Sequence, residues 1–177
     1  MNTNDIVLLK KARKGDKSAI NSLFETYHRP AFNISCRILG RADIAEDIVM
    51  DCFLKVFQND FQISSNFSAY FYRSVVNASL NQLKKEQKEH ISSDDFNYEP
   101  TAPDNPENEI QKKAVISRIK QAINELPENQ KTAFILIKYQ ELSYKETAEI
   151  MQTTVKALEG LIKRAKENLK EKLKDLL

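Results

Sequence analysis

Apolar residues recur at helical spacing through the first half of the chain, and glycines or polar stretches interrupt the pattern at a few points. The pattern predicts four helices, which run from Asn4 or Asp5 to Arg13, from Ser18 to Leu39, from Ala42 to Phe57 and from Ser68 to Lys88. Pro30 lies inside the second helix, where its missing N–H donor is expected to bend the helix. A polar loop at 58–66 separates the third helix from the fourth.

The segment 91–110 breaks the helical pattern and differs in composition from the rest of the chain. It contains six acidic residues, no Lys or Arg, and three of the five prolines, so a continuous helix cannot form there. The flanking blocks are mildly basic, with a net charge of +3 over residues 1–90 and +5 over residues 111–177. We therefore expect an all-α protein with two small helical domains, 5–90 and 111–177, joined by a flexible acidic linker at 91–110.

The apolar pattern of residues 111–177 predicts four helices, of which the last two form a helix-turn-helix. The first should run from Gln111 to Leu126, and Pro127 should open the second, which is expected to reach Glu141. Ser143-Tyr-Lys-Glu has the form of a capping box, which predicts that the third helix begins at Tyr144. Gln152 and Thr153 then supply a turn, and Thr154 can cap the last helix.

The last predicted helix has one apolar and one mainly basic face. The apolar stripe follows 3-4-3-4-4 spacing and consists of Val155, Leu158, Ile162, Ala165, Leu169 and Leu173. On the opposite face lie Thr153, Lys156, Gly160, Lys163, Arg164 and Glu167. A basic exposed face beside a capped turn is what a DNA recognition helix needs, because cations neutralise phosphates. An ordinary amphipathic helix with a solvated charged face is the alternative, and the capping box and the small Ala148 in the preceding helix count against it.

An acidic stripe marks the third predicted helix of the first domain. Asp43, Asp47 and Asp51 recur every four residues, although like charges at this spacing repel each other. Met50 and Leu54 lie beside them, on the side away from the apolar stripe of Ile44, Ile48, Cys52 and Val56. A mixed acidic and apolar strip suggests a basic protein partner, with a solvated helix face as the alternative.

The fourth helix combines aromatic residues with cations and an asparagine. The members are Phe67, Tyr70, Phe71, Tyr72, Arg73, Asn77, Lys84 and Lys85. Such a mixture suits single-stranded DNA, whose bases stack on rings while cations hold the phosphates. Core packing is the commoner use of aromatic residues, and we expect Phe71 and Val75 to serve it. The preceding loop offers Asn59, Gln62, Ser64, Ser65 and Asn66, whose side chains could read a base edge.

Residues for catalysis are lacking in this sequence. His28 and His90 stand alone, and neither a phosphate-binding loop nor metal-ligand spacing is present. Cys36 and Cys52 lie in apolar-periodic segments and are expected to be buried thiols. We therefore expect no enzyme, no metal and no cofactor. No apolar run is long enough to span a membrane, so we expect a cytoplasmic protein.

Three segments, in this order, resemble the extracytoplasmic-function (ECF) group of bacterial RNA polymerase sigma factors, in the sigma-70 superfamily. They are DIAEDIVMDCFLKVF, FSAYFYRSVVNASLNQLKK and LPENQKTAFILIKYQELSYKETAEIMQTTVKALEGLIKRAKENL. The resemblance implies a subunit that binds core RNA polymerase and directs promoter-specific initiation. The first domain (sigma region 2) would melt the promoter and the second (sigma region 4) would read the minus-thirty-five element. The linker would run near the RNA exit path of the polymerase, where its charge imitates nucleic acid.

The resemblance also implies three sets of contact residues and several partners. The polymerase beta-prime coiled coil would bind Asp43, Asp47, Met50, Asp51 and Leu54, and the beta flap is a second polymerase partner. The minus-ten element would contact Asn59, Gln62, Ser64, Asn66, Tyr70, Arg73, Asn77, Lys84 and Lys85. The minus-thirty-five element would contact Tyr144, Lys145, Thr154, Lys156, Lys163 and Arg164. Both DNA-reading domains offer surfaces that an anti-sigma factor could mask.

The chain departs from the family pattern after the first turn of the recognition helix. Ala157, Glu159, Gly160 and Leu161 stand where family members often carry small or polar residues and a basic one. We therefore expect Lys156, Lys163 and Arg164 to contact mostly phosphates. The alternative function is an autonomous dimeric helix-turn-helix regulator, which would bind duplex DNA alone.

Overall fold

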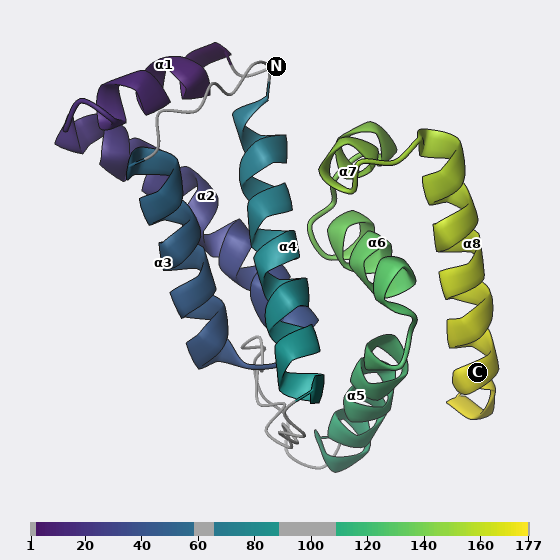
Figure 1. Cartoon of the computed structure of the whole chain (residues 1–177). Coiled ribbons are helices and arrows are strands. Elements are labelled where there is room, and N and C mark those ends of the chain that lie inside the picture. The colour runs from purple at the N-terminus through teal and green to yellow at the C-terminus, as the bar shows by residue number, and fades with distance from the viewer. Residues whose placement is uncertain (1–2, 59–65, 89–108, 177) are drawn as a thin grey trace. The chain divides into compact units, whose positions relative to one another are not determined.

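The computed structural model describes residues 3–58, 66–88 and 109–176, and within these ranges it is helical without any strand (Figure 1). The elements are α1 (Thr3–Ala12), α2 (Lys17–Leu39), α3 (Ala42–Gln58), α4 (Phe67–Lys88), α5 (Glu109–Asn124), α6 (Glu128–Lys138), α7 (Tyr144–Ile150), α8 (Val155–Lys172) and the short 3-10 helix η1 (Lys174–Leu176). The predicted all-α class is confirmed. Most of the predicted linker 91–110 and of the loop 58–66 lies outside the described residues.

The chain divides into two compact units, which are described separately. The first contains α1 to α4, and the second contains α5, α6, α8 and most of α7. In the first unit α2 packs against α1, α3 and α4, and α3 also packs against α4 (Figure 1). Its core is lined by buried aliphatic and aromatic side chains, among which the largest include Leu23, Ile34, Ile38, Val49, Val56, Phe67, Phe71 and Val75.

Helix α2 is defined at both ends by its cap residues. The Asp16 side chain accepts hydrogen bonds from the amides of Ser18 (3.0 Å) and Ala19 (3.1 Å) at its N-terminus. Gly40 ends the helix in the left-handed region, at φ 80°, where a residue without Cβ avoids strain. Pro30 lies within α2, and the helix continues through it to Leu39. The proline therefore does not end the helix.

The second unit is built on the packing of α6 against α8, with α5 also in contact with α8. Buried side chains of α6 include Ala133, Ile135 and Leu136, and α8 buries Leu158, Ile162 and Ala165. Polar contacts also join these helices: Asn168 donates to Gln130 (2.8 Å), and Lys172 pairs with Glu125. Arg118 of α5 pairs with Asp175 of η1 (2.6 Å). The last helix is thus held along its length.

Three of the predicted helix boundaries in the second unit were wrong. Pro127 is the N-cap of α6 and not its first helical residue, and α6 ends at Lys138 instead of Glu141. Glu141 has a φ of 54°, and this left-handed conformation cannot continue a right-handed helix. The preceding helix, α5, likewise ends at Asn124 and not at Leu126.

Candidate nucleic-acid interface

The start of α7 has the reciprocal hydrogen bonds of a capping box, as the sequence predicted. The Ser143 hydroxyl accepts from the amide of Glu146 (3.2 Å), and the Glu146 carboxylate accepts from the Ser143 amide (2.9 Å) and hydroxyl (2.6 Å). The bonds from Ser143 hold the pKa of Glu146 below its ordinary value. Because each side chain satisfies a donor at the helix start, the direction of α7 is fixed where the motif begins.

The turn between α7 and α8 also follows the prediction. Gln152 adopts a left-handed φ of 52°, and the Thr154 hydroxyl accepts from the amide of Ala157 (3.1 Å) as the N-cap of α8. Ala148 and Ile150 in the preceding helix are buried. The sequence 143–172 therefore forms two capped helices joined by a tight turn.

Helix α8 exposes a cationic face opposite its buried one. Leu158, Ile162 and Ala165 are buried, as predicted, whereas Lys156, Lys163 and Arg164 are exposed. The expected burial of Val155 was wrong, because 40% of this side chain is exposed at the first position of the helix. Leu169 and Leu173 are half-buried.

Gly160 lies within the cationic face of α8. A Cβ at this glycine would meet only the Arg164 guanidinium, at 3.9 Å. The face therefore has room for a methyl group there.

Helix α4 places the predicted nucleic-acid contacts on one side. Residues 66, 70, 73, 77 and 84 follow 4-3-4-7 spacing, which at 100° per residue gathers them within about 60° of the helix circumference. The residues at these positions, which we call the polar stripe, are Asn66, Tyr70, Arg73, Asn77 and Lys84, and Lys85 is exposed beside them. The opposite side is buried through Phe67, Phe71, Val75 and Ser79.

The aromatic residues of α4 thus divide between core and surface. Phe71 stacks on Phe67 (ring centroids 5.8 Å apart) and lies at a tilt against Phe53 (4.4 Å), which confirms its expected place in the core. Tyr27 of α2 meets Phe67 edge-on at 5.0 Å. Tyr70 is half-buried on the polar side of the helix. This division leaves Tyr70 as the aromatic residue of the polar stripe.

Asn66 also has a structural role that the sequence reasoning missed. Its side-chain oxygen accepts from the hydroxyl of Ser68 (2.8 Å) and the amide of Ala69 (3.3 Å), so it caps α4. The signal was visible, since Asn is among the preferred N-cap residues. The other loop candidates, Asn59, Gln62, Ser64 and Ser65, lie outside the described residues.

Helix α3 presents the predicted acidic and apolar strip. Asp43, Asp47, Met50, Asp51 and Leu54 are all exposed, with 40% of Met50 and 49% of Leu54 accessible. The buried side is formed by Ala45, Val49, Cys52, Phe53 and Val56, while Ile44 and Ile48 are partly buried. The strip is thus an external surface of the first unit.

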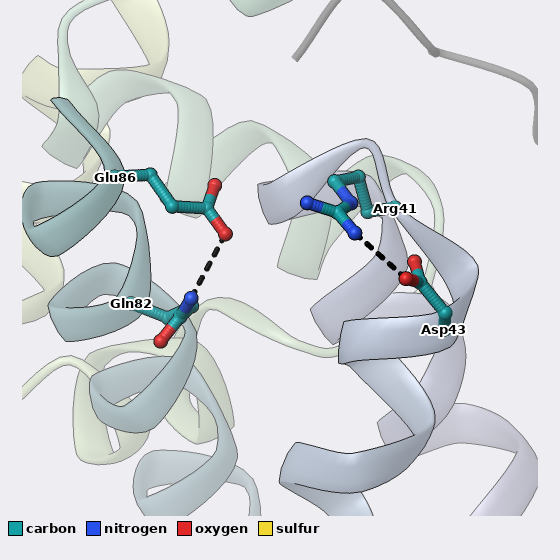
Figure 2. Close-up of polar contacts among 4 residues, drawn as sticks. All are labelled: Arg41, Asp43, Gln82 and Glu86. Carbon is teal, nitrogen blue, oxygen red and sulfur yellow. Dashed lines mark hydrogen bonds and ion pairs between the residues drawn. The ribbon is translucent and has the colours of Figure 1, made fainter. Parts of the chain in front are cut away.

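The carboxylates of the strip differ in their surroundings. Arg41 donates to Asp43 at 2.7 Å, and this bond, with the amide of Ile44, holds the pKa of Asp43 below its ordinary value (Figure 2). Figure 2 also shows Gln82 of α4 donating to Glu86 (2.8 Å), on the side of α4 away from the polar stripe. Asp47 and Asp51 have no ion pair within the described residues. They are therefore the acids of the strip whose negative charge no described cation pairs.

The described histidine and the two cysteines contact other residues of the first unit. His28 stacks on Phe24 and lies 2.7 Å from the Glu46 carboxylate, so it joins α2 to α3. Cys36 and Cys52 are buried thiols, as expected, and burial raises the pKa of Cys52 to about 11. His90 lies outside the described residues.

Among the residues that the structure describes, no group of His, Cys, Asp and Glu has the arrangement of a metal site. Within the same ranges, no helix combines the length and the apolar content that a membrane span requires.

Comparisons with known proteins match both units to regions of the same protein family. Residues 23–89 match the family "Sigma-70 region 2", and residues 116–169 match "Sigma-70, region 4". The chain is 32% identical to the ECF RNA polymerase sigma-E factor of Haemophilus influenzae, over 98% of this chain and 97% of that protein. It is 27% identical to the ECF RNA polymerase sigma factor SigW of Bacillus subtilis, over 95% and 96% of the two chains.

A solved structure is similar over most of the chain. It is the sigma factor RpoE in complex with the anti-sigma factor NepR from Bartonella quintana, with a TM-score of 0.62 and 25% identity. The match covers 87% of this chain and 96% of that one.

Proposed function

The chain belongs to the ECF family of RNA polymerase sigma factors, and from this premise we propose how its surfaces direct transcription. The chain binds core RNA polymerase and carries out no chemistry of its own. The first unit holds the polymerase and the melted minus-ten element, and the second reads the minus-thirty-five element. The observation that carries the proposal is the acidic strip on α3 in the same unit as the polar stripe of α4. Such a protein acts in the cytoplasm, where the polymerase works.

The α3 strip has the composition of a protein interface. Met50 and Leu54 supply exposed apolar area, and Asp47 and Asp51 surround it with negative charge. Apolar centres with charged surroundings are typical of specific interfaces, and the charge selects a partner of opposite sign. The basic partner that this surface fits is the beta-prime coiled coil. Because Arg41 already pairs with Asp43, Asp47 and Asp51 should contribute more to docking.

The polar stripe of α4 fits an unpaired DNA strand. Tyr70 offers a ring on which a base can stack, while Arg73, Lys84 and Lys85 can hold successive phosphates. Asn77 is exposed and carries both a donor and an acceptor for a base edge. Asn59, Gln62, Ser64 and Asn66 belong to the same proposal. Because Asn66 uses its oxygen to cap α4, its base contact would come from the amide group.

The cationic face of α8 fits the backbone of duplex DNA. Lys156, Lys163 and Arg164 are exposed on this face and can contact phosphates. Tyr144 and Lys145 are exposed at the start of α7. The Thr154 hydroxyl accepts the cap bond from Ala157, and its proton remains available for a phosphate oxygen. A few cationic contacts bind weakly and are sensitive to salt, so the polymerase must supply the rest of the affinity.

Further partners belong to the same proposal. The beta flap is a second polymerase contact, and the acidic linker 91–110 runs near the RNA exit path. RpoE of Bartonella quintana is found in complex with an anti-sigma factor. We extend a partner of this kind to the present chain, because its exposed DNA-reading faces are surfaces that such a protein can mask.

Charge reversal on α3 tests the docking assignment. Asp47→Lys combined with Asp51→Lys should weaken binding to core polymerase at least about tenfold, which corresponds to about 1.4 kcal/mol. Glu25→Lys is the matched control, since Glu25 is an exposed acid of α2 outside the strip and should leave core binding unchanged. Unchanged core binding by the double variant would show that the docking assignment is wrong.

A gel shift on a promoter fragment separates this function from an autonomous regulator. A sigma factor should give a specific complex only when core polymerase is present. A dimeric helix-turn-helix regulator should shift duplex DNA by itself, with half-sites spaced by a helical turn. A specific shift without polymerase would contradict the proposal.

A further inference from the structure

The connection between α1 and α2 concentrates positive charge. Residues 10–17 hold five of the Lys and Arg residues and a single acid, Asp16, which is a net charge of +4. The remainder of residues 1–90 has eight basic and nine acidic residues, a net charge of −1. The positive charge of the first unit therefore lies largely at one corner, which we call the basic corner and define as Lys10, Lys11, Lys14 and Lys17.

The cations of the basic corner are accessible and unneutralised. All four lysines are exposed, and none of them forms an ion pair within the described residues. The one acid of residues 10–17, Asp16, directs its carboxylate to the amides of Ser18 and Ala19 and forms no ion pair with these lysines. Its single negative charge leaves the segment with a net charge of +4.

The backbone of the corner is held in a defined conformation. Gly15 adopts a φ of 86°, and its amide donates to the carbonyl of Ala12 (2.9 Å). Arg13 Nε donates to the carbonyl of Val56, the third residue from the end of α3, at 3.0 Å. The lysines therefore extend from a fixed turn, so that a partner need not order the backbone on binding.

Helix stability explains only part of this charge. Lys10 and Lys11 lie in the last turn of α1, where cations interact favourably with the helix dipole. Lys17 is the first residue of α2, and a cation at a helix N-terminus is unfavourable for the same reason. Lys14 lies between the helices. Local stability therefore gives no reason for Lys14 and Lys17, which makes a binding role the better explanation.

The basic corner lies at the end of the first unit where α3 ends and α4 begins (Figure 1). The contact from Arg13 joins the corner to the last turns of α3. Tyr27 donates to Asp5 of α1 (2.5 Å) and meets Phe67, the first residue of α4. Asn66 and Tyr70, proposed above to hold an unpaired base, lie at this same end of α4.

We infer that the basic corner binds backbone phosphates of the promoter duplex beside the melted segment, an inference that rests on the proposed function. Residues 10–17 contain no large apolar side chain, whereas the centre of a protein interface is usually apolar or aromatic. Four cations without an apolar centre fit a phosphate backbone, which is read by charge alone. The contact positions the duplex and does not read its sequence.

The test replaces Lys10, Lys14 and Lys17 together, by Gln in one variant and by Arg in the matched control. Each is saturated with core polymerase, and its affinity for one promoter fragment is measured between 50 and 200 mM salt. Each lost phosphate contact reduces the salt exponent of the affinity by about 0.9. With three contacts, the affinity of the wild type should therefore fall about 40 times more over this salt range than the affinity of the Gln variant. The Arg variant should behave as wild type.

A second measurement locates the contact. Two further fragments are used, one whose duplex ends at the upstream edge of the melted segment and one whose duplex ends at the downstream edge. On one of the two, the wild type and the Gln variant should bind with the same affinity. If the difference persisted on both fragments, or if salt dependence were equal on the full fragment, the inference would be wrong. Reduced affinity of the Gln variant for core polymerase would instead indicate a protein partner and overturn it. Should the wild type give no promoter complex with polymerase, the proposed function itself would fail.

Discussion

Replacing Gly160 by Ala tests whether the cationic face of α8 is an ordinary helix surface with room to spare. Gly160 is the sixth residue of an 18-residue helix, far enough from both ends that its conformation is fully helical. Glycine in a helix interior costs about 1 kcal/mol relative to alanine. The added methyl group meets only Arg164, at an ordinary van der Waals distance of 3.9 Å. Gly160→Ala should therefore stabilise the second unit by about 1 kcal/mol.

Hydrogen exchange on the full-length chain measures this effect where it arises. A gain of about 1 kcal/mol should increase the protection of the slowest α8 amides about fivefold and leave those of α2 unchanged. Ala157→Gly, at an exposed position of the same helix, should reduce protection and serves as the reverse control. Unchanged or reduced protection in Gly160→Ala would refute the reasoning, because the site would then lack either its space or its helical conformation.

Promoter binding by the same variant, measured with polymerase, separates stability from function. If the absent side chain lets α8 approach the DNA backbone, Gly160→Ala will bind the promoter more weakly although its second unit is more stable. If promoter binding is unchanged, the glycine has no part in the approach. The two measurements together identify what Gly160 does in the cationic face of α8.

Further predictions concern the capping box, the core and a buried thiol. Ser143→Ala should destabilise the second unit by about 1 kcal/mol in thermal unfolding. The lowered pKa of Glu146 gives a stabilisation that is complete above its ordinary value of 4.5 and lost as pH falls through the lower folded-state value, so this variant should lose less stability on acidification than wild type. Phe71→Ala should cost about 3 to 5 kcal/mol, because the ring is fully buried among other rings, and equal denaturation midpoints would contradict this. Cys52, with a pKa of about 11, should resist alkylation at pH 8 until the chain is unfolded, and rapid labelling of the native protein would contradict its burial.

Helical periodicity and cap residues were sufficient to predict most of the helices and the helix-turn-helix. The capping box at Ser143 and the cap at Thr154 are local patterns, so the sequence contains the information that defines them. The end of α6 was missed because Glu141 is left-handed, a conformation usually signalled by Gly or Asn. Because Glu rarely adopts the left-handed conformation, local residue preferences could not predict that Glu141 does so.

Contacts between distant helices were harder to predict. Periodicity shows which face of α8 is apolar but not how far the other helices cover that face. The exposure of Val155 could therefore not be predicted from the spacing. The pairing of Arg41 with Asp43 depends on the turn between α2 and α3, so the three carboxylates of α3 could not be distinguished from spacing alone. The basic corner was hidden when charge was averaged over residues 1–90.

Run-off transcription on a promoter fragment tests the central claim most directly. The purified chain, core polymerase and the two together are compared on one template, with Asp47→Lys, Asp51→Lys as the docking-deficient variant. We predict a transcript with a defined start only when the wild-type chain and core polymerase are both present, and loss of that transcript in the variant. Transcription by core polymerase that does not change when the chain is added, on a promoter that the chain binds alone, would contradict the account.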